Sequence, residues 1–329
     1  MTETAGRITL WHIEVFVATA EEASISAAAQ RLGASASSVS QQLTNLETGL
    51  GTSLLNRNER PMSLTPAGTL FLRRAQTILN EAARARAELA RRDPAMLTRL
   101  RLGVIEDFDA EVTPRLLRAL AQEMTGCQFL LETGASHRLF DKLETRALDM
   151  IVASEMGAEA AWMEMHPVLT EPFVAAVPKD SVEEGADLMA VLRQMPLILY
   201  TERHHMGRVI ASHLAQQNLR LSHRFELDSY HAIMAMVAAG EGWTILTPLG
   251  FMHAARFREQ ADVLPLPFAP FSRRISLTAR RGVMEDIPAR TAERLREMLA
   301  EYVVAPALER MPWLDGALRV ERGTAPAAV

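Results

Sequence analysis

The chain has 329 residues, a formal net charge of −5 and one cysteine, and 48% of its residues are hydrophobic. This length allows two or three domains with separate cores, and the composition is ordinary for a soluble globular protein. A single cysteine excludes an internal disulfide framework. No apolar run reaches the length of a membrane span, and residues 1–7 lack a secretory pattern, so we expect a cytoplasmic protein.

The lone cysteine, Cys127, stands in the apolar run Cys127–Leu131. We expect a buried strand residue there, because a redox-sensing thiol more often has a resolving partner.

The acidic net charge limits how the chain could bind nucleic acid. Any affinity for nucleic acid must come from a few arginines and helix N-termini placed locally, since no basic field covers the whole chain.

Between residues 10 and 51 the sequence predicts three helices. Residues 10–20 have apolar side chains at helical spacing. Ser24 is suited to cap a second helix, which Gly33 would end in the left-handed conformation, and Ser35 would cap a third. The third helix would turn inward Val39, Leu43 and Leu46 and end at Gly49 and Gly51. Two short helices around a glycine turn are typical of a helix-turn-helix.

A basic hairpin and a long helix follow. Residues 53–65 have turn residues at Asn56–Pro61 between two short apolar segments, which predicts a hairpin. Pro66 is typical of a first helical position, and the apolar spacing continues this helix to about Arg92.

These elements predict an N-terminal all-α winged helix-turn-helix DNA-binding domain over residues 1–65. A long helix after a small domain usually separates two protomers, so residues 66–94 are interpreted as a linker and dimerisation helix. Packing of this helix on its own domain is the alternative.

From residue 95 strands alternate with helices, which predicts parallel βαβ units. We expect an α/β domain over residues 95–321, with subdomain I from 95–170 and 272–321 and subdomain II from 171–271. The tail, residues 322–329, is rich in Ala and Pro and is predicted to be disordered. The predicted strands are 100–105, 128–132, 149–153, 173–177, 197–200, 224–227, 242–246 and 275–279, and the predicted helices are 112–124, 136–146, 206–217, 230–239 and 289–303.

Short motifs within residues 8–92 are specific, and looser ones follow. The specific motifs are Phe16-Val17-Ala18, Ser24, Ala27-Ala28, Arg31-Leu32, Ser35, Val39-Ser40, Leu46-Glu47, Leu50-Gly51, Leu54-Leu55, Arg57, Leu64-Thr65 and Ala67-Gly68. The looser motifs are Gly134-Ala135-Ser136, Leu148-Asp149 and Gly240-Glu241-Gly242-Trp243. Together these residues resemble the LysR-type family of bacterial transcriptional regulators, and the resemblance covers nearly the whole chain.

The resemblance implies DNA-binding homodimers that associate into homotetramers on double-stranded DNA with an interrupted palindrome. It also implies that residues 95–321 form an effector-binding domain similar to a type 2 periplasmic binding protein. A small-molecule effector would bind in the cleft between its two subdomains. The resemblance implies no cofactor.

The third helix is expected to lie in the major groove with its N-terminal half toward the bases. Gln41, where relatives commonly have arginine, can pair with adenine through two hydrogen bonds. In the segment Ser35–Ser38 many relatives have glutamine and proline, and Ala36 cannot bond a base edge. The hairpin arginines are placed to reach the DNA backbone or a narrow minor groove. The candidate DNA-binding residues are Ser35, Ser37, Ser38, Ser40, Gln41, Gln42, Arg57 and Arg60. A capped, solvated helix face is the alternative for the serine run.

Four segments should line the cleft, since ligands bind at the carboxyl ends of parallel strands and at helix N-termini. The candidate effector-binding residues are Asp107, Phe108, Gly134, Ala135, Ser136, Thr201, Glu202, Arg203, His204 and Trp243. Acidic side chains attract cations, and the rings of Phe108, Tyr200 and Trp243 suit an ammonium group, so we predict a cationic or neutral amine effector. Two alternatives remain: these acids face water, or Ser136 and free helix amides hold an anion.

The sequence predicts neither a metal site nor catalysis. His204, His205 and His213 suggest metal binding, but adjacent histidines do not readily face one ion, and no cysteine or carboxylate spacing completes a site. No nucleophile elbow, P-loop or dinucleotide glycine motif is present. The main interpretation is therefore an effector-controlled transcription regulator. The alternative is an α/β small-molecule receptor or enzyme with an N-terminal protein-interaction module.

Overall fold

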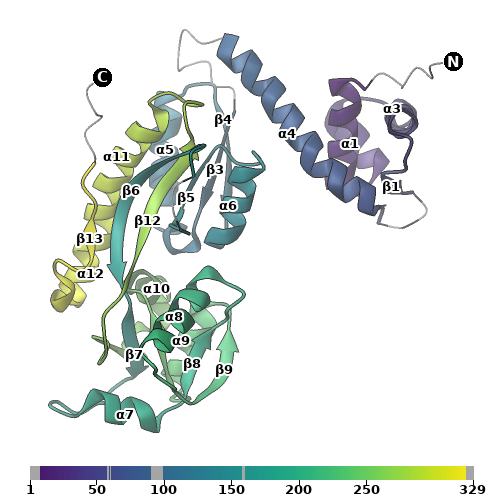
Figure 1. Cartoon of the computed structure of the whole chain (residues 1–329). Coiled ribbons are helices and arrows are strands. Elements are labelled where there is room, and N and C mark those ends of the chain that lie inside the picture. Colours follow the sequence, from purple (N-terminus) through teal and green to yellow (C-terminus); the bar gives the residue numbers. More distant parts are fainter. Residues whose placement is uncertain (1–7, 58, 60, 90–98, 158–159, 324–329) are drawn as a thin grey trace. The chain divides into compact units, whose positions relative to one another are not determined.

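A computed structural model describes residues 8–57, 59, 61–89, 99–157 and 160–323 (Figure 1). It divides into an N-terminal unit, residues 1–97 with 144–147, and a C-terminal unit formed by the remainder. Arg60, the end of the predicted linker helix from residue 90 and the predicted tail from residue 324 lie outside the described residues. Across the described ranges, none of the helices combines the length and apolar character needed to cross a membrane.

The N-terminal unit begins with the three predicted helices. They are α1 (Leu10–Glu22), α2 (Ile25–Leu32) and α3 (Ala36–Leu50). Ser24 and Ser35 cap α2 and α3, as predicted, by accepting hydrogen bonds from backbone amides three residues later. Gly33 and Gly51 follow these helices with φ of 62° and 67°, a conformation that glycine adopts without the steric cost of a Cβ. Gly49 lies inside α3, so only Gly51 ends that helix.

The hairpin and the long helix complete this unit. They are β1 (Leu55–Asn56), β2 (Ser63–Leu64) and α4 (Pro66–Leu89). The hydroxyl of Thr65 accepts a hydrogen bond from the Gly68 amide at 2.9 Å and caps the start of α4. A Cβ at Gly68 would lie 2.0 Å from the Leu54 carbonyl oxygen, so glycine allows this close approach of α4 to the hairpin.

One hydrophobic core holds the helices of the N-terminal unit together. Phe16 of α1 is fully buried, and its ring centroid lies 5.3 Å from that of Phe71 on α4. Val39, Leu43 and Leu46 form the buried face of α3, as predicted. This packing fixes the orientation of α3 and leaves its opposite face in solvent.

The first sheet of the C-terminal unit has six strands in the order β13-β6-β12-β5-β3-β4. β3 pairs in parallel with β4 and β5, whereas β12 is antiparallel to both β5 and β6. The strands are β3 (Arg99–Val104), β4 (Gln128–Thr133), β5 (Met150–Ser154), β6 (Met163–Pro172), β12 (Ser272–Arg280) and β13 (Arg319–Val320).

The second sheet has five strands in the order β11-β7-β10-β8-β9. β8 is parallel to β9 and β10, and β7 is antiparallel to β10 and β11. The strands are β7 (Val174–Pro178), β8 (Leu197–Tyr200), β9 (His223–Leu227), β10 (Trp243–Leu246) and β11 (Ala261–Leu264).

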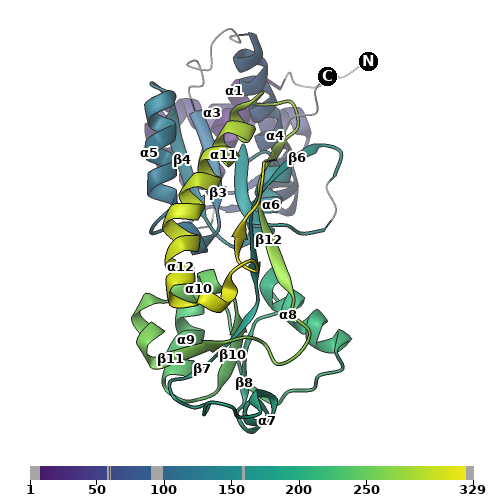
Figure 2. The same ribbon diagram turned by 90° about the vertical axis from the view of Figure 1, so that its left-hand side faces the viewer.

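Helices cover both sheets (Figures 1 and 2). The α-helices are α5 (Thr113–Glu123), α6 (Ser136–Glu144), α7 (Leu188–Gln194), α8 (His205–Gln216), α9 (Tyr230–Ala238), α10 (Pro248–His253), α11 (Ile287–Leu299) and α12 (Ala305–Arg310). Short helical turns are η2 (Glu106–Phe108), η3 (Ala255–Gln260), η4 (Ala300–Val304) and η5 (Pro312–Leu314). Together with the N-terminal unit, this arrangement confirms the predicted fold class.

The predicted parallel βαβ pairing is found between β3 and both β4 and β5, and between β8 and both β9 and β10. Both sheets also contain antiparallel strands, which the sequence did not predict. β6 and β12 each connect the two sheets directly, without a crossover helix, and pair antiparallel with each other (Figure 2). The chain passes between the sheets at Phe173 and again over residues 265–271. β6 and β11 were not among the predicted strands, and the prolines and charged residues of β6 obscure its alternating pattern.

Cys127 directly precedes β4 and is half-buried, so the prediction of a buried strand residue is wrong. The physical reason is that β4 lies at the edge of its sheet, where side chains keep access to solvent. Burial and the Asp149 carboxylate raise the pKa of the Cys127 thiol. The reactive thiolate is therefore disfavoured at neutral pH.

Candidate functional site

The outward face of α3 carries the predicted DNA-reading side chains. Ser37 and Gln41 are exposed, and Ser38, Ser40 and Gln42 are half-buried. The buried face of the same helix holds it against the core, so these polar groups are presented on a rigid element. A helix with this arrangement can enter the major groove of a duplex.

The N-terminal end of α3 is organised by its serines. The Ser35 hydroxyl accepts a hydrogen bond from the Ser38 amide at 3.2 Å and lies 3.0 Å from the Ser37 hydroxyl. Further along, the Gln41 side-chain amide donates to the Asn45 side-chain oxygen at 3.0 Å. Asn45, which the sequence did not single out, therefore orients Gln41. The positive end of the helix dipole lies at the same serines, which favours a phosphate nearby.

Glu47 was also missed, and it ties the hairpin to α3. One of its carboxylate oxygens accepts hydrogen bonds from the amides of Leu54 and Leu55 at 2.7 and 3.2 Å. The other accepts one from the Arg57 guanidinium at 2.6 Å, and Arg57 also donates to Thr44 at 3.3 Å. Arg57 is thus bound within the protein and positions the hairpin. The predicted partner on the hairpin tip, Arg60, lies outside the described residues.

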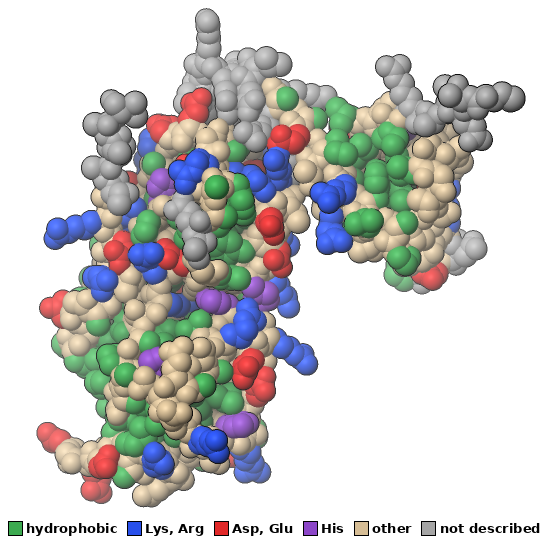
Figure 3. Space-filling model, viewed as in Figure 1, with side chains coloured by type: hydrophobic (Ala, Val, Ile, Leu, Met, Phe, Trp, Pro, Cys, Tyr) green, Lys and Arg blue, Asp and Glu red, His purple; other side chains and the backbone are tan. Residues whose placement is uncertain are grey.

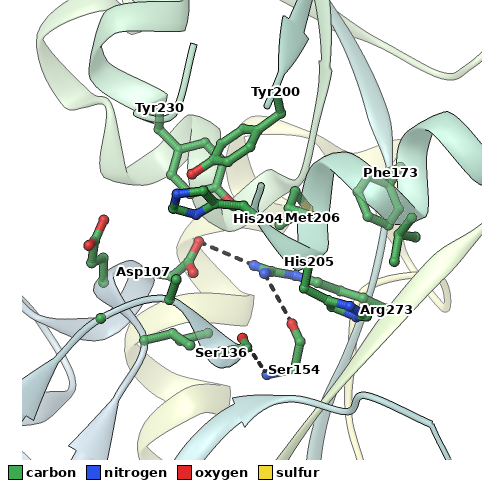
Figure 4. A pocket seen from close by; sticks show the side chains of 15 residues that line it. Asp107, Ser136, Ser154, Phe173, Tyr200, His204, His205, Met206, Tyr230 and Arg273 are labelled. Atoms are coloured by element: carbon green, nitrogen blue, oxygen red, sulfur yellow. Dashed lines mark hydrogen bonds and ion pairs between the residues drawn. The ribbon is translucent and has the colours of Figure 1, made fainter. Parts of the chain in front are cut away.

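A pocket of about 50 Å³ lies between the two sheets of the C-terminal unit. Five of the predicted effector-binding residues line it: Asp107, Gly134, Ala135, Ser136 and His204. Figure 4 shows Tyr200, Tyr230 and His204 on one side of the pocket, facing Ser136 and Ser154 on the other. The site therefore draws on both sheets.

The other five predicted residues do not line this pocket. Phe108 and Trp243 are at most 1% exposed and fill the cores beside the pocket, so neither presents a ring to a ligand. The buried hydroxyl of Thr201 donates to the Glu226 carboxylate at 2.6 Å. Glu202 lines a separate groove beside α8, and Arg203 is exposed to solvent.

Two serine hydroxyls form a hydrogen-bonding wall. The Ser136 hydroxyl accepts from the Ser154 amide at 3.2 Å, and the Ser154 hydroxyl accepts from the Arg273 guanidinium at 3.2 Å (Figure 4). Because both hydroxyls accept in these bonds, each keeps its own proton for donation to a ligand in the pocket, among the contacts of the described residues. Ser154 and Arg273 were missed because each lies in or at the end of a strand.

Asp107 supplies the opposite chemistry, since a carboxylate only accepts hydrogen bonds. Its side chain is only 5% exposed and lies 3.2 Å from the Arg273 guanidinium. The prediction that acidic side chains here attract a cationic effector is therefore weakened for Asp107, because its charge is paired inside the protein. The pocket thus combines hydroxyl groups at Ser136 and Ser154 with a carboxylate acceptor at Asp107.

The histidines around the pocket contact other aromatic rings. The His204 ring centroid lies 5.5 Å from that of His137 and 5.6 Å from that of Tyr200. Burial lowers the pKa of both His137 and His205. These two imidazoles are therefore neutral at pH 7, and a neutral ring can donate or accept a hydrogen bond.

His213 lies apart from this group. Its ring stacks on Phe271 at 3.9 Å between centroids, and its Nε2 lies 2.7 Å from the Ala269 carbonyl oxygen. Among the described side chains, no group of three or more His, Cys, Asp or Glu residues is placed to hold a metal ion.

A winged helix-turn-helix joined to an α/β unit of two mixed sheets is the architecture of a class of DNA-binding transcription regulators. Matches to family models assign the chain to one family within this class. The model for bacterial regulatory helix-turn-helix proteins of the lysR family matches residues 10–69, and the model for the LysR substrate binding domain matches residues 97–303. The chain belongs to the LysR family. It is a DNA-binding transcriptional regulator and not an enzyme.

Curated relatives include regulators of peroxide-inducible genes. A probable hydrogen peroxide-inducible genes activator of Mycobacterium avium is 33% identical over 198 residues, which span 60% of this chain and 63% of the relative. The hydrogen peroxide-inducible genes activator of Pectobacterium carotovorum is 26% identical over 88% of this chain and 97% of its own. The Escherichia coli K12 regulator OxyR is 26% identical over 82% and 88%.

Solved structures show the same fold. A cysteine-to-aspartate variant of full-length OxyR from Pseudomonas aeruginosa has a TM-score of 0.68 at 24% identity and covers 91% of this chain and 96% of its own. Full-length CbnR in complex with its target DNA has a TM-score of 0.61 at 23% identity, covering 88% and 100%. At these identities the likeness concerns the fold alone.

Proposed function

We propose that this regulator controls transcription in response to a small polar effector bound between subdomains I and II of residues 95–321. The observation that carries the proposal is the pocket with hydroxyl donors from Ser136 and Ser154 on one wall and the Asp107 carboxylate on another. Both kinds of group are held by buried contacts, so the site is organised before a ligand binds.

The volume of the pocket limits the size of the effector. About 50 Å³ is room for roughly four water molecules, at ~10–15 Å³ each. Drug-sized ligands occupy pockets of about 300–1,000 Å³. We therefore propose an effector well below the size of a drug molecule.

The lining sets the chemistry of this effector. An acceptor group, such as a carboxylate or carbonyl, fits the serine hydroxyls, and a donor or ammonium group fits Asp107. The amine predicted from the sequence remains as the donor end of such a molecule. Because Arg273 already balances Asp107, an amine alone gains less than a molecule that satisfies both walls.

The N-terminal domain, residues 1–65, would read an interrupted palindrome as part of a homodimer or homotetramer. Leu70 and Ile78 on α4 are 57% and 42% exposed, and Leu10 and Trp11 on α1 are 37% and 38% exposed. Figure 3 shows hydrophobic side chains gathered on one face of this unit. Exposed apolar side chains in such numbers favour a partner protomer on the helix of residues 66–94.

The decisive experiment measures the thermal stability of the full-length protein with three matched probes. Glycine has both an acceptor and a donor end, acetate has only the acceptor, and methylammonium has only the donor. We expect stabilisation by glycine to exceed that by either single-function probe, and Ser136→Ala to reduce it while the exposed control Ser222→Ala does not. Equal stabilisation by acetate and glycine would contradict the role of Asp107.

A peroxide response is the function that the names of the relatives suggest, and it has a separate test. Cys127 is the single cysteine of the chain, and it does not line the pocket. We therefore expect hydrogen peroxide to change the affinity for the operator by less than about twofold, with or without Cys127→Ala. A peroxide effect that disappears in Cys127→Ala would show thiol sensing instead.

A further inference from the structure

Two oppositely charged side chains lie where the chain passes between the subdomains. Arg273 on β12 and Glu171 on β6 are opposite each other in the antiparallel register, next to the last pair, Ser272 and Pro172. The guanidinium Nε and Nη2 lie 2.6 and 2.5 Å from the same Glu171 oxygen. Any rotation between the subdomains must bend the chain at these two strand ends.

This pair is bonded to both subdomains. In subdomain I, Asp107 and Ser154 each accept a hydrogen bond from the guanidinium at 3.2 Å. In subdomain II, the Thr247 hydroxyl accepts one at 3.4 Å, and the Leu249 amide donates to the second oxygen of Glu171 at 3.1 Å. The guanidinium thus bridges the two halves of the pocket.

Burial makes these contacts costly to break. The side chains of Arg273, Asp107 and Glu171 are 8%, 5% and 0% exposed. Burial also raises the pKa of Glu171. An unpaired buried charge is strongly destabilising, so a rotation that separates these groups must offer each one a new partner. Only arginine has the planar set of five donors needed to hold four partners at once.

Asp107 and Ser154 both accept hydrogen bonds from the Arg273 guanidinium, and both line the pocket. A ligand donor that bonds Asp107 competes with the guanidinium for the negative charge of that carboxylate. We infer that Arg273 is a positioning residue that couples occupancy of the pocket to the angle between the subdomains. This inference rests on the proposed function, and it adds the element by which a bound effector would change the conformation.

The test compares Arg273→Lys with Arg274→Lys in the full-length protein. Lysine keeps the positive charge beside Glu171 but cannot bridge both subdomains. Arg274 is the matched control, since it is the next residue of β12, is 53% exposed and pairs with Glu155 of subdomain I at 2.7 Å. The readouts are amide exchange in β6 and β12 without ligand, and the affinity for operator DNA with and without saturating glycine.

We expect Arg273→Lys to accelerate exchange at residues 170–174 and 270–274 by about tenfold and Arg274→Lys by less than about twofold. With glycine at saturation for each variant, the DNA affinity of Arg273→Lys should no longer change, whereas that of Arg274→Lys should change as in the unmodified protein. Equal exchange in the two variants would overturn the inference. Failure of glycine to bind the unmodified protein would contradict only the proposed effector class, because the exchange comparison needs no ligand.

A second pair of variants covers the case in which Arg273→Lys does not fold. Asp107→Asn removes the charged contact with subdomain I and leaves the Arg273–Glu171 pair in place. Asp286→Asn is its control, since Asp286 is 60% exposed and its ion pair with Arg290, at 3.6 Å, lies within subdomain I. Faster exchange at the two strand ends in Asp107→Asn alone would support the inference, and no difference between these variants would overturn it.

Discussion

The helix predicted to read DNA and the proposed effector pocket are built in opposite ways. On α3 the candidate residues lie within eight positions of one another, and they are exposed or half-buried on a single helix face. In the pocket, Asp107 and Arg273 are 166 positions apart and almost fully buried. The first surface depends on one helix being held in place, whereas the second depends on how two sheets meet.

This difference determines how each region should respond to change. An exposed face can lose a side chain with little cost in stability, because water replaces the lost contacts. A buried charged cluster cannot, because removal of one partner leaves another charge without compensation. Substitutions on α3 should therefore change what the protein binds, and substitutions around the pocket should also change how it moves.

The largest expected effects on stability come from removing a buried aromatic ring from either hydrophobic core. Phe16 in the N-terminal unit and Phe108 in the C-terminal unit are 0% and 1% exposed. Replacement of either by alanine should cost about 3–5 kcal/mol in the unit that contains it. Phe16→Ala should abolish operator binding and leave amide protection in the two sheets unchanged, while Phe108→Ala should reduce protection there. Loss of protection in both units from either substitution would show that they do not unfold separately.

The same difference explains what could be predicted from sequence. Ser24, Gly33 and Ser35 predicted the boundaries of α2 and α3 because a cap acts on amides only two or three residues away. The partners of Asp107 could not be predicted in this way, since Arg273 is 166 positions away and no local pattern marks it. Phe108 was misassigned to the pocket because its position after β3 was visible, but the direction of its ring was not.

Glu47 offers a smaller effect that tests how the hairpin is held. Glu47→Ala removes the acceptor for the amides of Leu54 and Leu55 and the partner of Arg57. We expect a loss of about 1–3 kcal/mol in the stability of the N-terminal unit and weaker operator binding. Glu21→Ala, which removes an exposed ion pair with Arg31, is the control and should cost less than ~1 kcal/mol. Similar losses from both variants would argue against Glu47 as the anchor of the hairpin.

Gln41 tests the opposite case from Glu47, since loss of the Gln41 side chain should change DNA specificity rather than protein stability. Gln41→Ala should reduce the preference for operator over random DNA by up to about tenfold, as expected when a bidentate base contact is lost. Gln30→Ala, an exposed glutamine on α2, should leave this preference unchanged. Equal loss of affinity on operator and random DNA would assign Gln41 to the phosphate backbone instead.

The smallest expected effect is a pH dependence confined to the C-terminal unit. Burial lowers the pKa of His205 below its ordinary value, so the unfolded chain takes up a proton at higher pH than the folded protein does. The unit should therefore lose stability as the pH falls below about 6.5 and show no such loss above it. Between pH 7.5 and 5.5, His205→Gln should reduce the fall in melting temperature by roughly 1–3 °C. His223→Gln, at an exposed position in the same subdomain, should leave that fall unchanged; if it does not, the titrating group is not in the pocket.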